Sequence, residues 1–139
     1  MKKKILILLS ILGLAIYTSC NSDDDSVQPE ILNGTWNLIN ASGGIAGVNE
    51  SYQNGSVTWT FDSQNSTVTI ENNSQATVYT LSTNGTYSYT IVESEDKQYL
   101  HINDVEIGRY VLSTNTLIVN ENEIASGSRA DAFVLQFQR

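Results

Sequence analysis

Residues 56–62 read SVTWTFD, in which apolar and polar side chains alternate at every position. Because successive side chains of a β-strand point to opposite faces, this alternation predicts a strand with Val57, Trp59 and Phe61 on its buried face. The same alternation returns in residues 86–92 and 131–138. No window shows a sustained helical period, and Pro is absent after Pro29. The chain from residue 31 onward is therefore predicted to be an all-β domain.

Clusters of Asn, Gly, Ser and Asp divide this domain into nine expected strands. These are residues 34–41, 56–62, 67–71, 76–81, 86–92, 98–102, 106–112, 116–120 and 131–138. Thr83-Asn84-Gly85 is typical of a hairpin turn, because Asn-Gly tolerates the positive φ of tight turns. Residues 42–55 and 121–130 are expected to be loops. Eight or nine short antiparallel strands predict either a two-sheet sandwich or a closed barrel, and closure is favoured because it leaves no exposed edge.

The two ends of the domain resemble the lipocalin superfamily. The sequence LNGTW opens it at residues 32–36, and FQR closes it at residues 137–139. The resemblance implies an up-and-down barrel in which Arg139 lies across the ring of Trp36 and joins the last strand to the first. Such a guanidinium–indole contact contributes about 0.5 to 2 kcal/mol. Residues 42–55 are similar to the lid-like first loop of lipocalins.

More specifically, the domain is similar to the short lipocalin-like domains of Bacteroidota surface lipoproteins. The motifs that carry this likeness lie, in order, at residues 34–36, 42–47, 58–61, 85–89 and 137–139. Two lipocalin features are missing from the sequence. No Thr-Asp-Tyr motif precedes the seventh expected strand, and residues 121–130 are too few for the helix that full-length lipocalins place near their last strand.

The first twenty residues have the organisation of a secretory signal. Lys2, Lys3 and Lys4 precede an apolar run at residues 5–16, which is too short for a comfortable membrane span. The stretch resembles a bacterial lipoprotein signal, which implies cleavage after residue 19 and lipidation of Cys20. Residues 20–30 would then form a tether to the barrel domain at residues 31–139. An ordinary secreted protein with a stray Cys is the alternative.

An acidic run follows the expected anchor. It resembles the export signal that sends Bacteroidota lipoproteins to the outer face of the outer membrane, and it comprises Ser22, Asp23, Asp24 and Asp25. A plain acidic spacer is the alternative. Ser26, between Asp25 and Val27, resembles a Bacteroidota O-glycosylation signal. The expected location is therefore the outer membrane, facing the cell exterior.

Charge and composition narrow the function. Loss of residues 1–19 would leave four basic and fifteen acidic residues. This balance argues against nucleic-acid binding, which needs a basic surface. His101 is the only His and is expected at the surface, and Cys20 is the only Cys, so a zinc site would lack its usual ligands. Acidic residues at 93–96 and 121–123 are better read as solvated turns than as calcium loops. We therefore expect no enzyme activity, metal or cofactor, and a monomeric protein.

Two functions remain open at this point. In the first, the barrel binds a small apolar molecule, and a set of aromatic residues lines the site. That set is Trp59, Phe61, Tyr87, Tyr89, Phe133 and Phe137. In the second, these aromatics are ordinary core, and the protein acts through its loops on another protein or a glycan. Tyr79, Tyr99 and Tyr110 are expected to be exposed for such contacts, since Tyr is enriched in recognition surfaces.

Overall fold

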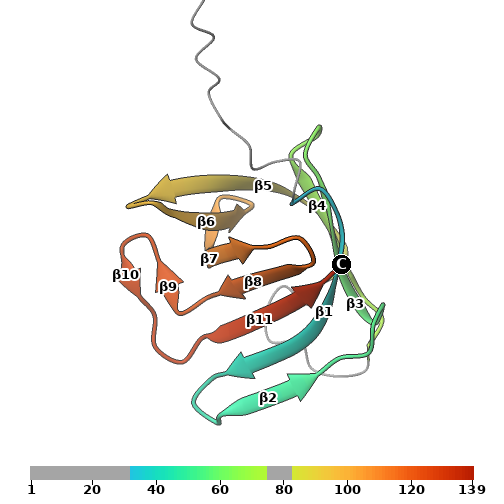
Figure 1. Cartoon of the computed structure of the whole chain (residues 1–139), viewed down its shortest axis with the longest axis horizontal. Helices are drawn as coiled ribbons and strands as arrows, with labels where there is room; N and C mark the ends of the chain where they lie inside the picture. The colour runs from blue at the N-terminus through green and yellow to red at the C-terminus, as the bar shows by residue number, and fades with distance from the viewer. Residues whose placement is uncertain (1–31, 75–82) are drawn as a thin grey trace, which may run out of the picture.

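A computed structural model describes residues 32–74 and 83–139. Eight antiparallel strands close into a barrel (Figure 1), because β1 pairs with β11 as well as with β3. The barrel strands are β1 (Gly34–Gly43), β3 (Val57–Asp62), β4 (Thr67–Asn72), β5 (Gly85–Ser94), β6 (Lys97–Ile102), β7 (Val105–Leu112), β8 (Thr116–Asn120) and β11 (Phe133–Gln138). The predicted all-β, up-and-down barrel is thus confirmed. Within the described residues, no helix is long and apolar enough to cross a membrane.

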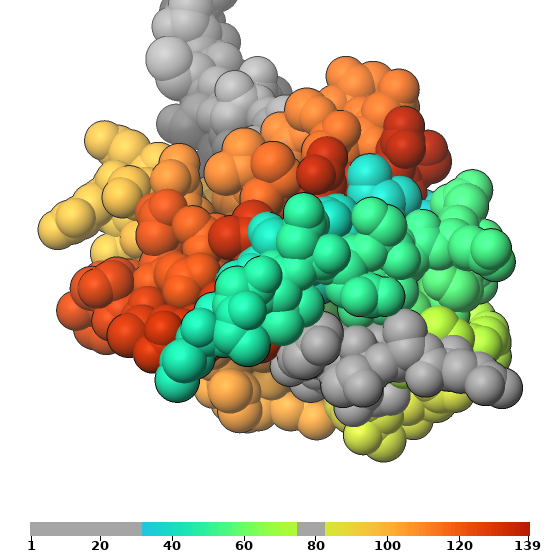
Figure 2. Space-filling model, turned by 90° about the horizontal axis from the view of Figure 1, so that it is seen from below, coloured from blue at the N-terminus to red at the C-terminus, as the bar shows by residue number. Residues whose placement is uncertain are grey.

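Three further strands lie in segments that were expected to be loops. β2 (Val48–Ser51) pairs with the second half of β1, and β9 (Glu123–Ile124) pairs with β10 (Gly127–Ser128). The prediction of structureless loops at residues 42–55 and 121–130 is therefore wrong. Gly43 lies at φ +132, a value that favours glycine, so the chain can fold back from β1 toward β2. The β1–β2 hairpin then lies beside the chain leading into β11, with the Gly44 amide donating to the Ala132 carbonyl at 3.1 Å (Figure 2).

The connection between β4 and β5 differs in part from the expectation. The predicted strand at residues 76–81 lies outside the described residues. β4 pairs directly with β5, Thr67 opposite Ser88 and Ile70 opposite Gly85. Gly85 is the first residue of β5 and does not have a positive φ, whereas the β5–β6 and β6–β7 turns have positive φ at residues 95–96 and 103–104. Asn84 instead accepts a hydrogen bond from the Asn72 amide at 2.7 Å.

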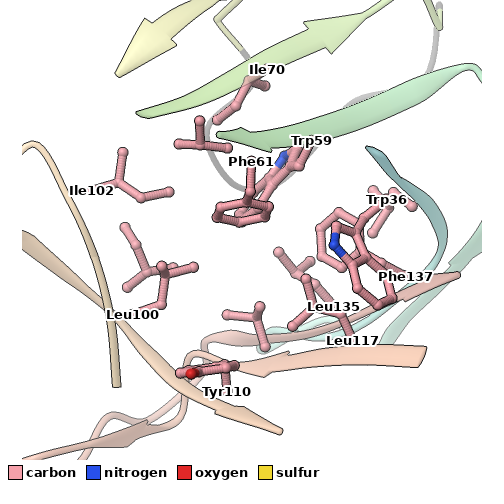
Figure 3. Packing of buried hydrophobic residues seen from close by; sticks show 14 of the residues in the cluster. Trp36, Trp59, Phe61, Ile70, Leu100, Ile102, Tyr110, Leu117, Leu135 and Phe137 are labelled. Carbon is pink, nitrogen blue, oxygen red and sulfur yellow. The ribbon is translucent and has the colours of Figure 1, made fainter. Parts of the chain in front are cut away.

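The inward faces of the barrel strands form one hydrophobic core (Figure 3). On β3, the residues at 57, 59 and 61 are each 1% exposed, as the alternation of SVTWTFD predicted. Facing strands contribute Leu100, Leu117 and Leu135. Closure brings β11 and β1 together, so Phe137 lies opposite Leu38 in the barrel wall.

Tyr99 and Tyr110 are buried, at 5% and 3% exposure, so the prediction that they are exposed is wrong. Tyr110 belongs to the core cluster, on the same side of β7 as Leu112. Tyr99 is buried next to Leu100, where a register shift between β6 and β7 interrupts the alternation of inward and outward residues. Tyr79 lies outside the described residues.

Candidate functional site

The first and last barrel strands are joined by Trp36 and Arg139. Trp36 is fully buried, and its indole Nε1 donates to the Leu32 carbonyl at 2.8 Å. The Arg139 guanidinium lies 4.3 Å from the centroid of the Trp36 ring and also donates to the Asn33 carbonyl at 2.9 Å. Gly34, at φ +110, takes a backbone conformation between these groups that a larger residue rarely adopts. The structure therefore brings this pair together.

The aromatic residues predicted to line a ligand site are packed against one another. The ring centroids of Trp59 and Phe137 are 4.8 Å apart, and those of Phe61 and Tyr89 are 5.1 Å apart in an edge-to-face arrangement. Both separations fall in the range of aromatic pairs that contact each other directly. Tyr87 and Phe133 are only partly buried and pack against the same cluster. These six side chains thus fill space in the barrel core.

The long β1–β3 and β8–β11 connections meet at the end of the barrel away from Trp36. The Phe133 ring lies so close to Gly44 that a Cβ there would be 2.9 Å from it. Glu121 is 7% exposed, and its carboxylate accepts a hydrogen bond from the Phe133 amide at 3.3 Å. Its burial was missed from the sequence, although it continues the alternation of Leu117 and Val119 by one step. Residues 121–123 are therefore not a solvated turn.

A surface groove lies where β6 and β7 separate. The last paired residues of these strands are Tyr99 and Arg109, yet β6 begins at Lys97 and β7 continues to Leu112. Beyond that pair, β7 pairs with β8 instead. The gap has a volume of about 290 Å³, and its wall comprises Glu93, Asp96, Lys97, Gln98, Arg109, Tyr110, Val111 and Leu112. It is thus an opening in the barrel wall with both polar and apolar sides.

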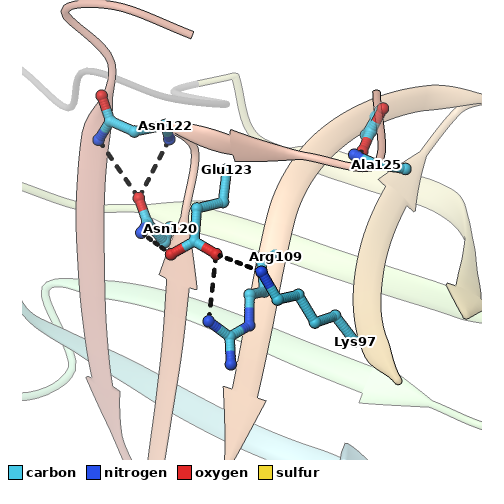
Figure 4. Close-up of polar contacts among 7 residues, drawn as sticks. Lys97, Arg109, Asn120, Asn122, Glu123 and Ala125 are labelled. Atoms are coloured by element: carbon cyan, nitrogen blue, oxygen red, sulfur yellow. Dashed lines mark hydrogen bonds and ion pairs between the residues drawn. The ribbon is translucent and has the colours of Figure 1, made fainter. Parts of the chain in front are cut away.

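The cations of this groove are engaged by a carboxylate outside it (Figure 4). Glu123 Oε2 accepts a hydrogen bond from Arg109 at 3.1 Å and lies 3.6 Å from Lys97 Nζ. Its second oxygen accepts from Asn120 Nδ2 at 2.9 Å. The Arg109 hydrogen bond is the main cause that lowers the pKa of Glu123, and the charges of Arg109 and Lys97 add to it. The pair of basic residues is therefore largely compensated.

Tyr110 is the buried polar residue of the groove wall. Its hydroxyl is shielded from solvent and has no hydrogen-bond partner among the described residues. Burial, with a smaller contribution from the neighbouring Tyr89, raises the pKa of Tyr110 to about 12. The phenol is therefore neutral at physiological pH, with a proton to donate and lone pairs to accept.

A second surface hollow adjoins the Trp36 end of the barrel. Asn33, Asp62 and Gln64 contribute to its wall. These polar groups already bond to nearby backbone: Asn33 Oδ1 accepts from the Ser63 amide at 3.0 Å, and Asp62 Oδ1 accepts from the Gln64 amide at 3.0 Å. The bonds from Asn65 and Gln64 lower the pKa of Asp62. Because these groups serve the β3–β4 turn, the β6–β7 groove is the better candidate for binding.

The remaining predicted residues take part in no common site. His101 is half-buried on β6, and its Nε2 is shielded from solvent without a partner in the described part of the chain, so it is not a simple surface residue. Glu95 and Asp96 form the exposed β5–β6 turn. No group of three or more His, Cys, Asp or Glu side chains in residues 32–74 and 83–139 could hold a metal ion. Cys20, Ser26 and the acidic run at 22–25 lie outside the described residues.

Comparison of the chain with protein-family models, curated proteins and solved structures gave no match. The functional argument therefore rests on the barrel, on the packing of its interior and on the groove in its wall.

Proposed function

We propose that this protein is a lipid-anchored, non-enzymatic monomer on the outside of the bacterial outer membrane, and that it acts through its surface. Two lines of support are independent of each other. The N-terminal sequence supports the anchor, through the apolar run ending at Cys20 and the acidic residues after it. The packing of the barrel supports surface action, since the interior aromatics contact one another.

The anchor and its orientation can be tested in the native host. Cys20→Ala should release the protein from the membrane fraction, because each buried methylene of an acyl chain contributes about 0.8 kcal/mol to anchoring. Replacing Asp23, Asp24 and Asp25 with Ala should protect the protein from protease added to intact cells. Continued digestion of that variant would contradict the export signal, and membrane retention of the Cys20 variant would contradict the anchor.

The carrying observation for surface action is the contact between Trp59 and Phe137 at the centre of the barrel, with both side chains at most 1% exposed. A native mass spectrum of the chain, extracted gently from its own host, tests it. We expect only the masses of the peptide, its lipid and any glycan on Ser26. An additional mass that organic solvent removes would instead indicate a ligand inside the barrel.

Binding of a small apolar molecule inside the barrel is the second candidate. Eight-stranded barrels are wide enough either for side-chain filling or for one small ligand. The partial exposure of Tyr87 and Phe133, at the edge of the core cluster, favours this candidate. The same mass spectrum separates the two functions.

A further inference from the structure

The groove between β6 and β7 has nearly balanced charge. Glu93 and Asp96 are acidic, whereas Lys97 and Arg109 are basic and are both bound to Glu123. An anion would meet two carboxylates and two cations that already have a partner. A cation would meet the same two basic residues close to the carboxylates. This arrangement favours an uncharged ligand over either kind of ion.

The same groove offers hydrogen-bonding groups of both kinds. The Tyr110 hydroxyl and the Gln98 amide can each donate and accept, while Glu93 and Asp96 accept. Among the described residues, the Tyr110 hydroxyl has no partner, so a ligand group bonded to it would satisfy a buried polar atom. A ligand hydroxyl suits this set, since it too both donates and accepts.

Apolar surface lies beside these groups. The groove wall includes Val111, Leu112 and the ring of Tyr110. Its volume of about 290 Å³ is close to the lower limit of small-molecule sites, about 300 Å³. A small ring with C–H groups on its face and hydroxyls at its edge would contact both kinds of surface at once.

We propose that the β6–β7 groove binds a neutral, hydroxyl-rich ring, that is, an uncharged sugar unit of a glycan. The binding residues are Gln98, Tyr110 and Leu112, with Glu93 and Asp96 as acceptors at the rim. Glu123 takes no part in contact and keeps Lys97 and Arg109 compensated. This inference rests on the proposed surface action, because it places the ligand in the barrel wall and not in the core.

Calorimetric titration of the full-length protein tests this site, in a detergent without a sugar head group. The probes are glucose, galactose, N-acetylglucosamine, maltose and cellobiose, with glucuronic acid and glucosamine as charged analogues. At least one neutral sugar should bind with a millimolar or tighter dissociation constant. Tyr110→Phe should weaken that binding by about 2- to 10-fold, the effect of one hydrogen bond.

Tyr99→Phe is the matched control, because Tyr99 is a buried tyrosine on the neighbouring strand that does not line the groove. It should bind the sugar as the wild type does. Tyr110→Phe should also leave the thermal midpoint of the free protein unchanged or raise it, since the hydroxyl it removes has no partner. Weaker binding by this variant would then not reflect unfolding.

Three results would overturn the inference: no neutral sugar binds the wild-type protein, a charged analogue binds more tightly than its neutral counterpart, or Tyr110→Phe and Gln98→Ala both bind like the wild type. The native mass spectrum keeps this failure separate from that of the proposed function. A bare protein mass with no sugar binding rejects the groove alone. A ligand inside the barrel rejects surface action as the principal function, while the titration still decides the groove.

Discussion

Arg139 connects the strand that ends the barrel with the strand that begins it. Its guanidinium contacts the Trp36 ring and donates to the Asn33 carbonyl. Arg139→Ala should therefore lower the free energy of unfolding by about 1 to 2 kcal/mol, measured by urea denaturation. Gln138→Ala is the control, because that side chain is exposed, and it should change stability by less than about 0.5 kcal/mol. Equal stability of the two variants would refute a closing role for Arg139.

Tyr110 makes the stability of the barrel sensitive to alkali. Burial raises its pKa to about 12, above the value of about 10 expected in the unfolded chain. A raised folded pKa means that the contribution to stability is complete below about pH 10 and is lost as the pH rises toward 12. Urea midpoints measured across this range should fall less in Tyr110→Phe than in the wild type. Parallel curves would show that Tyr110 ionises as it does in the unfolded chain.

At the scale of elements, the β9–β10 hairpin is held against β7 by Glu123, through Arg109 and Lys97. Since the folded pKa of Glu123 is lowered, its contribution is present at neutral pH and is lost as the pH falls through that pKa. The carboxylate is 35% exposed, and solvent screening limits the effect to about 1 kcal/mol.

Glu123→Gln tests this attachment. Urea denaturation at neutral pH should show a small loss of stability, and in acid, below the usual Glu pKa of about 4.3, the variant and the wild type should converge. Glu50→Gln, an exposed residue on β2, is the control and should follow the wild type at both pH values. A constant difference between Glu123→Gln and the wild type would mean that the ion pairs do not contribute.

The register shift between β6 and β7 depends on Gly108. A Cβ at this position would overlap the Asn120 carbonyl of β8. Gly108→Ala should therefore destabilise the barrel by about 1 to 3 kcal/mol, as overpacking does elsewhere. Val105→Ala on the same strand is 60% exposed and should be nearly neutral in the same urea experiment. A stable Gly108→Ala variant would show that β7 can shift away from β8 without cost.

Elements were predictable from the sequence where alternation is regular and failed where it is not. The expected strand at residues 116–120 has the bounds of β8, and SVTWTFD gives β3 to within one residue. β2, β9 and β10 have four, two and two residues, too few to show a period. Tyr99 was misplaced because a register shift depends on how two strands pair, which a single strand's pattern does not contain.

Over the whole molecule, the alternation and the motifs at the two ends were sufficient for the closed barrel. The candidate site was not accessible in the same way. The groove exists because β6 and β7 stop pairing at Tyr99 and Arg109, and the role of Glu123 depends on a hairpin that folds back onto β7. Both are tertiary properties. The aromatic set was found from the sequence, yet only the ring distances show that its members contact one another.

The central claim is that the barrel interior is a filled core, and the stability of Trp59→Ala tests it most directly. The ring of Trp59 lies 4.8 Å from Phe137 and 6.3 Å from Phe61. Its removal from a filled core should lower the free energy of unfolding by about 3 to 5 kcal/mol in urea. A variant that loses less than about 1 kcal/mol would contradict the account, because a side chain lining an open cavity leaves no new void when it is truncated.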